Sequence, residues 1–543
     1  MQIPIHEVPV LIVGGGATGL AASILLSRLG MRSLLVERHV GTSVPPLATG
    51  LTTRTMELFR HWGIDTRIRD YVLDVDISVS RGQTLAGVER HREALGFPTA
   101  DQARAVSPAQ PVICSQEFVE RALRDLAGAS PLAELRFDTQ LVSLSQDATG
   151  VDAVVRVGIS GRESRIRAQY VVAADGVASA VRRHVGIPML ASTRTIDYLA
   201  VTFRASIDHL ARGRRCAVYA IEHPDVNGLL VPTSRGGRWV LCMPYDPARE
   251  PRLVRDLPAL ADKVRTAVGV ADLHVDVIEA STAQGATQVA ERFRAGRVFL
   301  AGDAAHELDP LHGMGMGTGI QDVNNLAWKL AAVLQGWGGR SLLDTYESER
   351  RPVAVRNAAR SNGALQQLSG LALDMGFGYV SSAVIGEPGA MRGGVDEPAT
   401  VAAPGRRAPH FWLQHNGRRI SSLDLFGQGF VLLAGPEGDA WIEAAAKVSL
   451  AWSAHIDTVV LNERSLGSNA VERWTSHMGL DPRGAVLVRP DGHVAWRSAG
   501  LRSGAVASMT AVVATVLGRD GEESRTLTGT VLHPAYAPSR RSA

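Results

Sequence analysis

The hydrophobic positions at the start of the chain predict a strand, a helix and a second strand. Residues 10–13 form a continuous apolar run, residues 17–29 suit a helix that ends at Gly30, and residues 34–36 form a second apolar run. Short apolar runs bounded by glycine are typical of buried strands, and the longer segment is typical of a helix. This order of elements indicates an α/β protein with parallel strands.

The same order returns near residue 300 and predicts a ligand site there. Residues 298–301 suit a buried strand that ends at Gly302 and Asp303, and a helix that ends at Gly336 follows a glycine-spaced loop. The loop glycines occupy every second position: Gly313, Gly315, Gly317 and Gly319. Residues without a Cβ let a backbone lie close against a flat ligand, and the positive end of the helix favours an electron-rich one. Open α/β sheets bind ligands at this end of their strands.

The middle of the chain predicts a sheet without intervening helices. Residues 187–289 lack the alternation of strand and helix, and the apolar runs 198–203, 216–221 and 239–243 predict strands that carry few charges. Such strands suit the wall of a pocket for a large planar molecule, although apolar strand residues are more often simply core.

The last third predicts a further small α/β domain. After a region at 386–404 that contains glycine and proline, the runs 430–433, 459–461 and 485–488 predict strands, and a turn at 491–492 leads into another. This segment holds no cysteine, which excludes dithiol chemistry there.

The composition sets limits on the class of protein. The chain has 543 residues, enough for several domains, and its 45% hydrophobic and 20% charged residues are typical of a globular protein. With 57 basic and 54 acidic residues the formal charge is +3, too small to indicate a nucleic-acid partner. No stretch approaches 18 apolar residues, so we expect no membrane span. The three cysteines are far apart, which fits a cytoplasmic protein without disulfides or a metal site: Cys114, Cys216 and Cys242.

The first strand-helix unit carries a candidate nucleotide site. Gly14, Gly16 and Gly19 form G-x-G-x-x-G between strand and helix, and Glu37 ends the second strand 18 residues after the last of them. The glycines allow a tight turn and let a diphosphate approach the helix N-terminus, and the acid is placed to accept from an adenosine ribose. A strand-helix-strand unit without a nucleotide is the alternative.

A third motif completes a family pattern. Residues 170–174 suit a buried strand, which Asp175 and Gly176 follow in the run A-D-G-x-x-S-x-V-R. With the glycine triplet and the segment 297–330, this run resembles the class A flavoprotein aromatic hydroxylases, the family typified by para-hydroxybenzoate hydroxylase. The resemblance is to the polyketide-hydroxylase branch. It implies a Rossmann-type FAD-binding domain, an inserted antiparallel-sheet substrate domain and a C-terminal thioredoxin-like α/β domain.

The resemblance also implies how the chain is divided. The FAD-binding domain would comprise residues 1–186 and, with following helices, 290–390; the substrate-binding sheet would comprise 187–289; and the thioredoxin-like domain without cysteines would comprise 404–530. For the last domain we expect a role in packing or in a homodimer.

Site residues follow from the same resemblance. Asp303 would hold the ribityl chain, Pro310 would sit near the flavin ring, and the amides of Gly315 to Gly317 would face its pyrimidine edge. Gln116, at a predicted helix start, would contact the flavin. The other expected FAD contacts are Gly14, Gly16, Ala17, Thr18, Gly19, Glu37, Arg38, Leu141, Asp175 and Met316.

Four positions depart from the family. Leu47 and Thr49 stand where relatives carry basic residues, His312 replaces a glycine, and Gly317 replaces an asparagine. We predict Pro310 and His312 as catalytic residues: the imidazole would donate to the flavin or deprotonate a phenolic substrate near neutral pH. A loop histidine exposed to solvent is the simpler alternative.

The implied function is an FAD-dependent monooxygenase of antibiotic biosynthesis. It would use NADPH or NADH and O2 to hydroxylate, or oxidatively rearrange, an aromatic or quinoid polyketide through a flavin C4a-hydroperoxide. A flavin-dependent reductase or halogenase on the same fold is one alternative, although the chain lacks the Trp-x-Trp pair of tryptophan-type halogenases. A flavoprotein that sequesters a ligand without turnover is the other.

Overall fold

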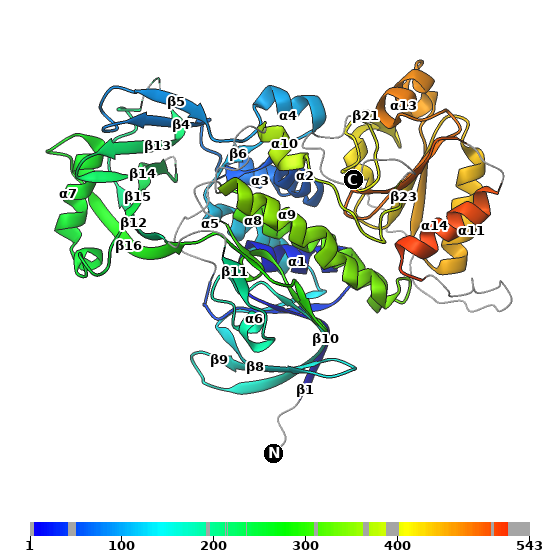
Figure 1. The fold of residues 1–543 in the computed structure, drawn as a ribbon, viewed down its shortest axis with the longest axis horizontal. Helices are drawn as coiled ribbons and strands as arrows, with labels where there is room; N and C mark the ends of the chain where they lie inside the picture. Colours follow the sequence, from blue (N-terminus) through cyan, green and yellow to red (C-terminus); the bar gives the residue numbers. More distant parts are fainter. Residues whose placement is uncertain are drawn as a thin grey trace.

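The computed structural model describes most of the chain: residues 5–41, 50–191, 196–211, 213, 215–234, 236–308, 313–361, 369–386, 401–500 and 504–519. The described residues form a central layered body, a sheet on one side of it and a smaller α/β body on the other (Figure 1). The mixed α/β class predicted from the sequence is confirmed.

The central body is built on a sheet with a parallel core. Its strands lie in the order β18-β19-β10-β1-β2-β7, and β9 and β8 continue antiparallel from β10. The long strands β1 and β10 pair over most of their length because both end in continuous apolar runs. The bounds are β1 (Ile5–Val13), β2 (Ser33–Val36), β7 (Ala133–Arg136), β8 (Thr139–Gln146), β9 (Val151–Val157), β10 (Glu163–Ala173), β18 (Arg294–Ala295) and β19 (Val298–Leu300).

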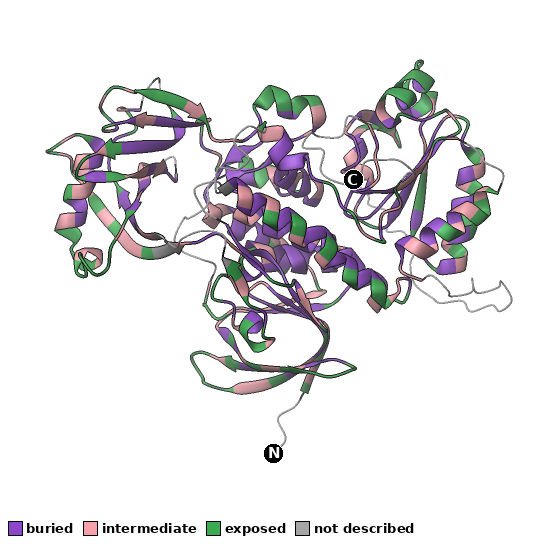
Figure 2. Ribbon diagram, viewed as in Figure 1, coloured by how far each residue is buried: buried purple, intermediate pink, exposed green. Residues whose placement is uncertain are grey.

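Helices cover this sheet. Helix α1 (Ala17–Arg28) packs between α8 (Gly315–Leu334) and α5 (Gln116–Gly128), and α1 and α8 are buried along most of their lengths (Figure 2). Helix α9 (Thr345–Ser361) contains Pro352. The shorter helices are α2 (Thr53–Trp62), α3 (Asp65–Arg69), α4 (Ala100–Val106), α6 (Ala180–His184) and α10 (Gly370–Met375).

The second sheet is mostly antiparallel and has the strand order β16-β12-β15-β14-β13-β4-β5. Alternation places Leu199, Val201 and Phe203 of β12 on the face that α7 (Leu257–Val268) covers, so Tyr198 and Thr202 lie on the opposite face. In Figure 1, α7 lies on the side of the sheet away from the central body. The bounds are β12 (Ile196–Arg204), β13 (Cys216–His223), β14 (Val226–Pro232), β15 (Arg238–Pro244) and β16 (Asp276–Gly285).

Two strands of this sheet come from an unexpected part of the chain. Strands β4 (Asp76–Gly82) and β5 (His91–Ala94) lie within the segment 1–186, which the sequence suggested was wholly FAD-binding. β4 pairs in parallel with β13 and antiparallel with β5, so this segment contributes two strands to the second sheet. Two further small sheets occur among the described residues. One has the strand order β11 (Met189–Ala191), β17 (Gln288–Ala290), β20 (His306–Glu307), and the other pairs β3 (Gly50–Leu51) with β6 (Val112–Ile113).

The C-terminal body is thioredoxin-like. Its sheet has the order β24-β23-β25-β26, with β23 and β24 parallel and the other pairs antiparallel. Trp328 of α8 packs in one hydrophobic cluster with Phe430 and Trp441, so this body shares a core with the central one. Its elements are β21 (Trp412–His415), β22 (Arg418–Ser421), β23 (Phe430–Ala434), α11 (Asp439–Trp452), β24 (Ile456–Val460), α12 (Glu463–Leu466), α13 (Ala470–Met478), β25 (Ala485–Val488), β26 (Val494–Ser498) and α14 (Ala505–Val516).

Candidate cofactor site

The turn between β1 and α1 leaves space beside Gly16. Gly14 has a φ of +111°, its amide donates to the Val36 carbonyl at 2.8 Å, and a side chain there would collide with the Ala174 carbonyl. At Gly16 a Cβ would meet, among the described atoms, only Oε1 of Glu120 at 3.7 Å. No side chain caps α1 and its first turn holds no acid. Its free amides therefore suit a diphosphate.

Glu37 and Gln116 lie on two sides of this turn. Oε2 of Glu37 accepts from the Gly15 amide at 2.7 Å, which holds the carboxylate at the end of β2. Gln116 opens α5, as expected, and its side chain donates to Oε1 of Glu120 at 2.7 Å. Because Glu120 also lies nearest to Gly16, the start of α5 borders the space beside the turn.

Hydrogen bonds connect the Asp175 segment, at the end of β10, to the turn around residue 303. Oδ1 of Asp175 accepts from the Ser179 hydroxyl at 2.5 Å, and Oδ2 accepts from the Val181 amide at 3.1 Å. The guanidinium of Arg182 donates to the Ala304 carbonyl at 3.1 Å. The Asp175 motif is thus tied to the turn that carries Asp303, and a contact of Asp175 with FAD stays a prediction.

Asp303 faces the first turn of α8. A Cβ at Gly315 would lie 3.8 Å from Oδ1 of Asp303, and Asp303 is exposed while the other residues of its short 3-10 turn are buried. Desolvation by the surrounding protein raises the pKa of this carboxyl, and the negative charge of Asp322 adds to the increase. His306 has the opposite, lowering effect. No side chain caps α8 and no acid lies in its first turn, so its amides can face an electron-rich group.

The glycine-spaced segment differs from the expectation of a loop. Helix α8 begins at Gly315, so three of the four glycines lie in the helix. A Cβ at Gly317 would press on the Thr55 side chain of α2, and one at Gly319 would collide with the Thr18 side chain of α1. These glycines therefore let α8 approach two other helices closely, a tertiary requirement that local sequence does not reveal.

Asp322 of α8 fixes the turn that carries Asp303. Its Oδ2 accepts from the Gly302 amide at 3.1 Å and lies 2.7 Å from Nε2 of His306, and its Oδ1 accepts from Nε of Arg350 at 2.7 Å. Burial raises the pKa of Asp322, but His306 and Arg350 outweigh burial and hold it below its usual value. Asp322 is therefore a buried anion with a full set of donors.

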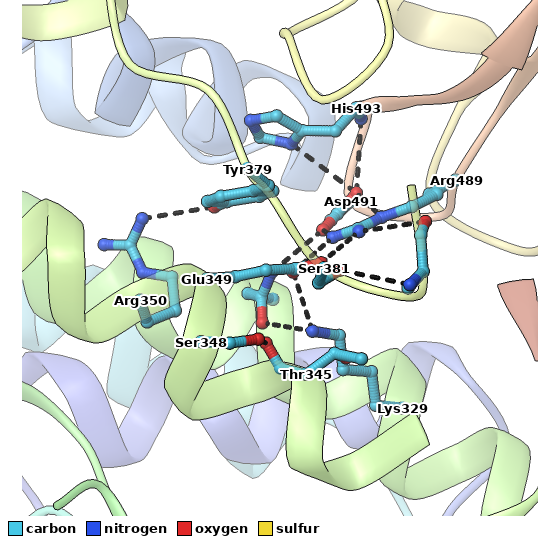
Figure 3. A network of polar contacts seen from close by, with 12 residues as sticks. Lys329, Thr345, Ser348, Glu349, Arg350, Tyr379, Ser381, Arg489, Asp491 and His493 are labelled. Carbon is cyan, nitrogen blue, oxygen red and sulfur yellow. Dashed lines mark hydrogen bonds and ion pairs between the residues drawn. The ribbon is translucent and has the colours of Figure 1, made fainter. Parts of the chain in front are cut away.

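A second buried network joins α8 and α9 to the C-terminal body (Figure 3). The Glu349 carboxylate accepts from both terminal nitrogens of Arg489, at 2.6 and 2.8 Å, and from Nζ of Lys329 at 2.7 Å. Arg489 also pairs with Asp491. Burial raises the pKa of Glu349, but Arg489 and Lys329 outweigh it and keep the carboxyl ionised. Glu349 and Arg350 are neighbours on α9, so one helix contacts both networks.

Glu57 of α2 makes a further contact with the C-terminal body. It accepts from Arg54 at 2.8 Å, from Nε of Arg407 at 2.9 Å and from the Ser107 hydroxyl at 2.6 Å. Burial raises its pKa, but Arg407 and Arg54 lower it to about 2. Both inter-body contacts therefore depend on ionised, fully paired side chains.

The sequence analysis missed these networks. The sequence did contain one indication of them. Asp322 and Lys329 are two charged residues seven positions apart in a helix that is otherwise largely apolar and buried. Charged residues that cannot reach solvent need partners, but the sequence does not say which. Arg350 and Glu349 lie in a charged stretch that by itself predicts only an exposed helix face.

A buried carboxyl beside this site predicts a pH dependence of stability. Asp374 accepts from the Arg54 amide at 3.2 Å, and burial raises its pKa to about 6, against the lowering effect of Thr52. A carboxyl whose pKa is higher in the folded protein than in the unfolded chain costs stability as it ionises. The free energy of unfolding should therefore fall by roughly 3 kcal/mol between about pH 4 and pH 6.

Asp374→Asn should remove that part of the pH dependence, which chemical denaturation at a series of pH values would measure. The matched change Asp101→Asn, at a side chain 89% exposed, should keep the wild-type dependence. Equal slopes for wild type and Asp374→Asn would contradict the assignment.

The predicted catalytic residues Pro310 and His312 lie outside the described residues, as do Leu47 and Thr49, two of the positions that depart from the family. Leu141 is buried in β8. The remaining residues surround the turn or the start of α8: Ala17, Thr18 and Gly19 in α1, exposed Arg38 after β2, and Met316 in α8.

Within the described ranges, no group of three or more His, Cys, Asp or Glu side chains could hold a metal ion. No helix in that part of the chain is long and apolar enough to cross a membrane.

Comparison with known proteins agrees with this geometry. Residues 7–361 match the FAD binding domain family, and residues 401–520 match the aromatic-ring hydroxylase C-terminal family. A putative polyketide hydroxylase of Streptomyces halstedii is 39% identical over 91% of this chain and 94% of its own length. The tetracenomycin B2 monooxygenase-dioxygenase of Streptomyces olivaceus is 37% identical over 94% of this chain and 99% of its own.

Solved structures show the same likeness. Aklavinone-11 hydroxylase in a ternary complex with FAD and aklavinone superposes with a TM-score of 0.85 at 33% identity, covering 95% of this chain and 100% of that one. The flavin-dependent monooxygenase PieE, in complex with FAD and substrate, gives a TM-score of 0.85 at 29% identity over the same shares.

The fold and the site thus define an FAD-binding α/β protein. The chain belongs to the FAD-binding aromatic-ring hydroxylases and is a flavin monooxygenase.

Proposed function

We propose that this monooxygenase hydroxylates, or oxidatively rearranges, an aromatic or quinoid polyketide, with NADPH or NADH as the reductant. The observation that carries the proposal is the convergence of the Gly16 turn, Asp303 and the start of α8 at the carboxyl ends of β1, β10 and β19. Relatives whose names specify tetracenomycin and aklavinone substrates support the polyketide class.

The chain's own residues would hold FAD and leave its redox chemistry to the cofactor. When bound, FAD supplies electron transfer from the nicotinamide nucleotide to O2 and delivery of one oxygen atom. The amides of α1 would bind the diphosphate, Glu37 would accept from the ribose and Asp303 would bind the ribityl chain. The amides at Gly315 and Gly317 would stabilise negative charge on the flavin edge. Pro310 and His312 stay as predicted catalytic residues.

The second sheet would hold the substrate on its face away from α7. A cavity of ≈ 750 Å³ lies on this face, and its lining includes Tyr198, Leu229 and Cys242. Its lining also includes the ionisable side chains of Arg81, Glu222 and His223, and this mixture of apolar and polar groups suits a polycyclic aromatic molecule with polar substituents. We further propose cytoplasmic localisation, a homodimer, and a role for the C-terminal body in packing.

Turnover tests the function. Protein purified with FAD should oxidise NADPH or NADH faster when an aromatic polyketide is added, and mass spectrometry should find one oxygen atom from labelled O2 in the product. A product that gains only hydrogen would indicate a reductase, and one that gains a halogen would indicate a halogenase. Tight ligand binding without nucleotide oxidation would favour a sequestering protein.

A further inference from the structure

We propose that the substrate cavity on the second sheet binds its ligand with the long axis across the strands, and that Ala220, Cys242 and Arg81 select the ligand. Ala220 and Cys242 would admit a molecule of several fused rings, and Arg81 would bind an oxygen substituent at one end of it. This inference rests on the proposed function, because it takes the cavity on the face away from α7 as the substrate site.

The floor of the cavity is one row of side chains across neighbouring strands. Each member of the row lies directly opposite the next, from β12 to β4: Ala200, Cys242, Leu229, Ala220 and Arg81. Residues directly opposite each other point to the same face of a sheet, and all of this row except Ala200 line the cavity. At about 4.8 Å between strands, the row is roughly 19 Å long.

Bulkier residues border this row on both sides, two positions along each strand. One border consists of β-branched residues that lie opposite one another on three strands: Thr202, Val240 and Val231. The other border also lines the cavity: Tyr198, Pro244, Asn227 and Glu222. The two borders are four residues apart, roughly 13 Å between the rows. The longer free direction therefore runs across the strands.

Two small side chains keep the space above the floor open. Cys242 and Ala220 flank Leu229 in the row, and neither side chain extends more than one atom beyond its Cβ. Leu229 is partly exposed and offers an apolar surface to the plane of a ring. A leucine at either small position would fill volume in which fused rings would lie. These two positions therefore limit the number of rings that the cavity accepts.

Arg81 ends the row with a nitrogen that is available to a ligand. Its Nε and Nη2 donate to Oε1 of Glu93 at 2.8 and 2.5 Å. Its Nη1 lies 3.5 Å from Oε1 of Glu222, which is longer than an ordinary N–H···O hydrogen bond. An oxygen atom of a ligand at this end of the row can therefore accept from Nη1.

The charges around Arg81 offset one another, which indicates a neutral acceptor. Glu222 also pairs with Arg90 at 3.9 Å, so two arginines face two carboxylates. The imidazole of His223, which also lines the cavity, is neutral as bonded, because its Nδ1 accepts from the Asp225 amide at 3.1 Å. A carbonyl or hydroxyl oxygen of an aromatic polyketide suits this end better than an ionised carboxylate.

Binding of ligands with different numbers of rings tests the two small positions. Calorimetric titration of the oxidised, FAD-loaded protein would give affinities for aklavinone, which has four fused rings, and for 1-naphthol, which has two. We expect Ala220→Leu and Cys242→Leu each to weaken aklavinone binding by about tenfold or more, and 1-naphthol binding by less than about threefold. The control Ala94→Leu, at an exposed position of β5 outside the cavity, should match wild type. FAD content and circular dichroism would show that each variant is folded.

A ligand pair that differs by one oxygen atom tests Arg81. Wild type should bind 1-naphthol about tenfold more tightly than naphthalene, because the hydroxyl oxygen accepts from Nη1. Arg81→Met should bind the two compounds alike. The control Arg249→Met, whose side chain is 87% exposed and outside the cavity, should keep the wild-type preference.

The other outcomes separate this inference from the proposed function. Wild-type affinity for aklavinone in both leucine variants would overturn the size selection, and so would equal weakening of aklavinone and 1-naphthol. An unchanged preference for 1-naphthol in Arg81→Met would overturn the role of the arginine. If binding follows the expected pattern but wild type with NADPH or NADH and O2 forms no oxygenated product, the cavity assignment stands and the proposed function fails. Oxygenated product together with wild-type binding in every variant would keep the function and refute this inference.

Discussion

Glu349→Ala is expected to lower the free energy of unfolding by about 3–5 kcal/mol. The substitution leaves Arg489 and Lys329 buried with fewer counter-charges, since both donate to this carboxylate and all three side chains are fully buried. Removing one partner of a buried ion pair strongly lowers the free energy of unfolding, because the other charge stays buried without its partner. Replacing the whole pair with apolar side chains costs much less. Denaturant titration monitored by tryptophan fluorescence would measure the loss.

An exposed ion pair in the same body provides the control. Arg483 pairs with Glu437 at 3.0 Å, but the two side chains are 63% and 57% exposed. Arg483→Ala should therefore change stability by less than about 1 kcal/mol. If Glu349→Ala cost no more than Arg483→Ala, the network of Figure 3 would not hold the two bodies together.

Gly16→Val should give a folded protein that has lost its FAD. The described protein leaves room for a side chain at this position, since a Cβ would have only Glu120 within contact distance. A branched side chain would instead occupy the space that we assign to the diphosphate. Absorbance of the purified protein would give the FAD content, and circular dichroism would show that the fold is kept.

A second glycine of the same motif should behave differently. A Cβ at Gly19 would collide with the Gly14 carbonyl, so Gly19→Val should disturb the fold itself and reduce the yield of folded protein. Full retention of FAD by Gly16→Val would refute the assignment of the turn to the diphosphate.

Local sequence pattern predicted the elements that local interactions determine. The start of α5 at Gln116, the strand before Glu37 and the strand at residues 485–488 agree with the structure within a residue or two. Each is bounded by a change in hydrophobic pattern or by a turn residue, so a short window contained the information.

The remainder depends on contacts between distant residues. Strand β4 pairs in the second sheet with β13, which lies about 140 residues further along the chain, and no window around Asp76 reveals that partner. The first turns of α8 were predicted as a glycine-spaced loop against a ligand, but Gly317 and Gly319 are needed for close helix packing. The networks around Asp322 and Glu349 could not be predicted either. A buried charged residue indicates that an oppositely charged partner exists, but the sequence does not identify which residue it is.

The pairing of Glu349 with Arg489 also affects how the protein is made. Arg489 is 140 residues beyond Glu349. The Glu349 carboxylate on helix α9 therefore leaves the ribosome well before the Arg489 guanidinium that pairs with it. At 5–20 residues per second, roughly 7–30 s of further synthesis separate the two. During that interval Glu349 can pair with Lys329 of α8 but not yet with Arg489. The network that joins α8 and α9 to the C-terminal body is therefore completed only late in translation.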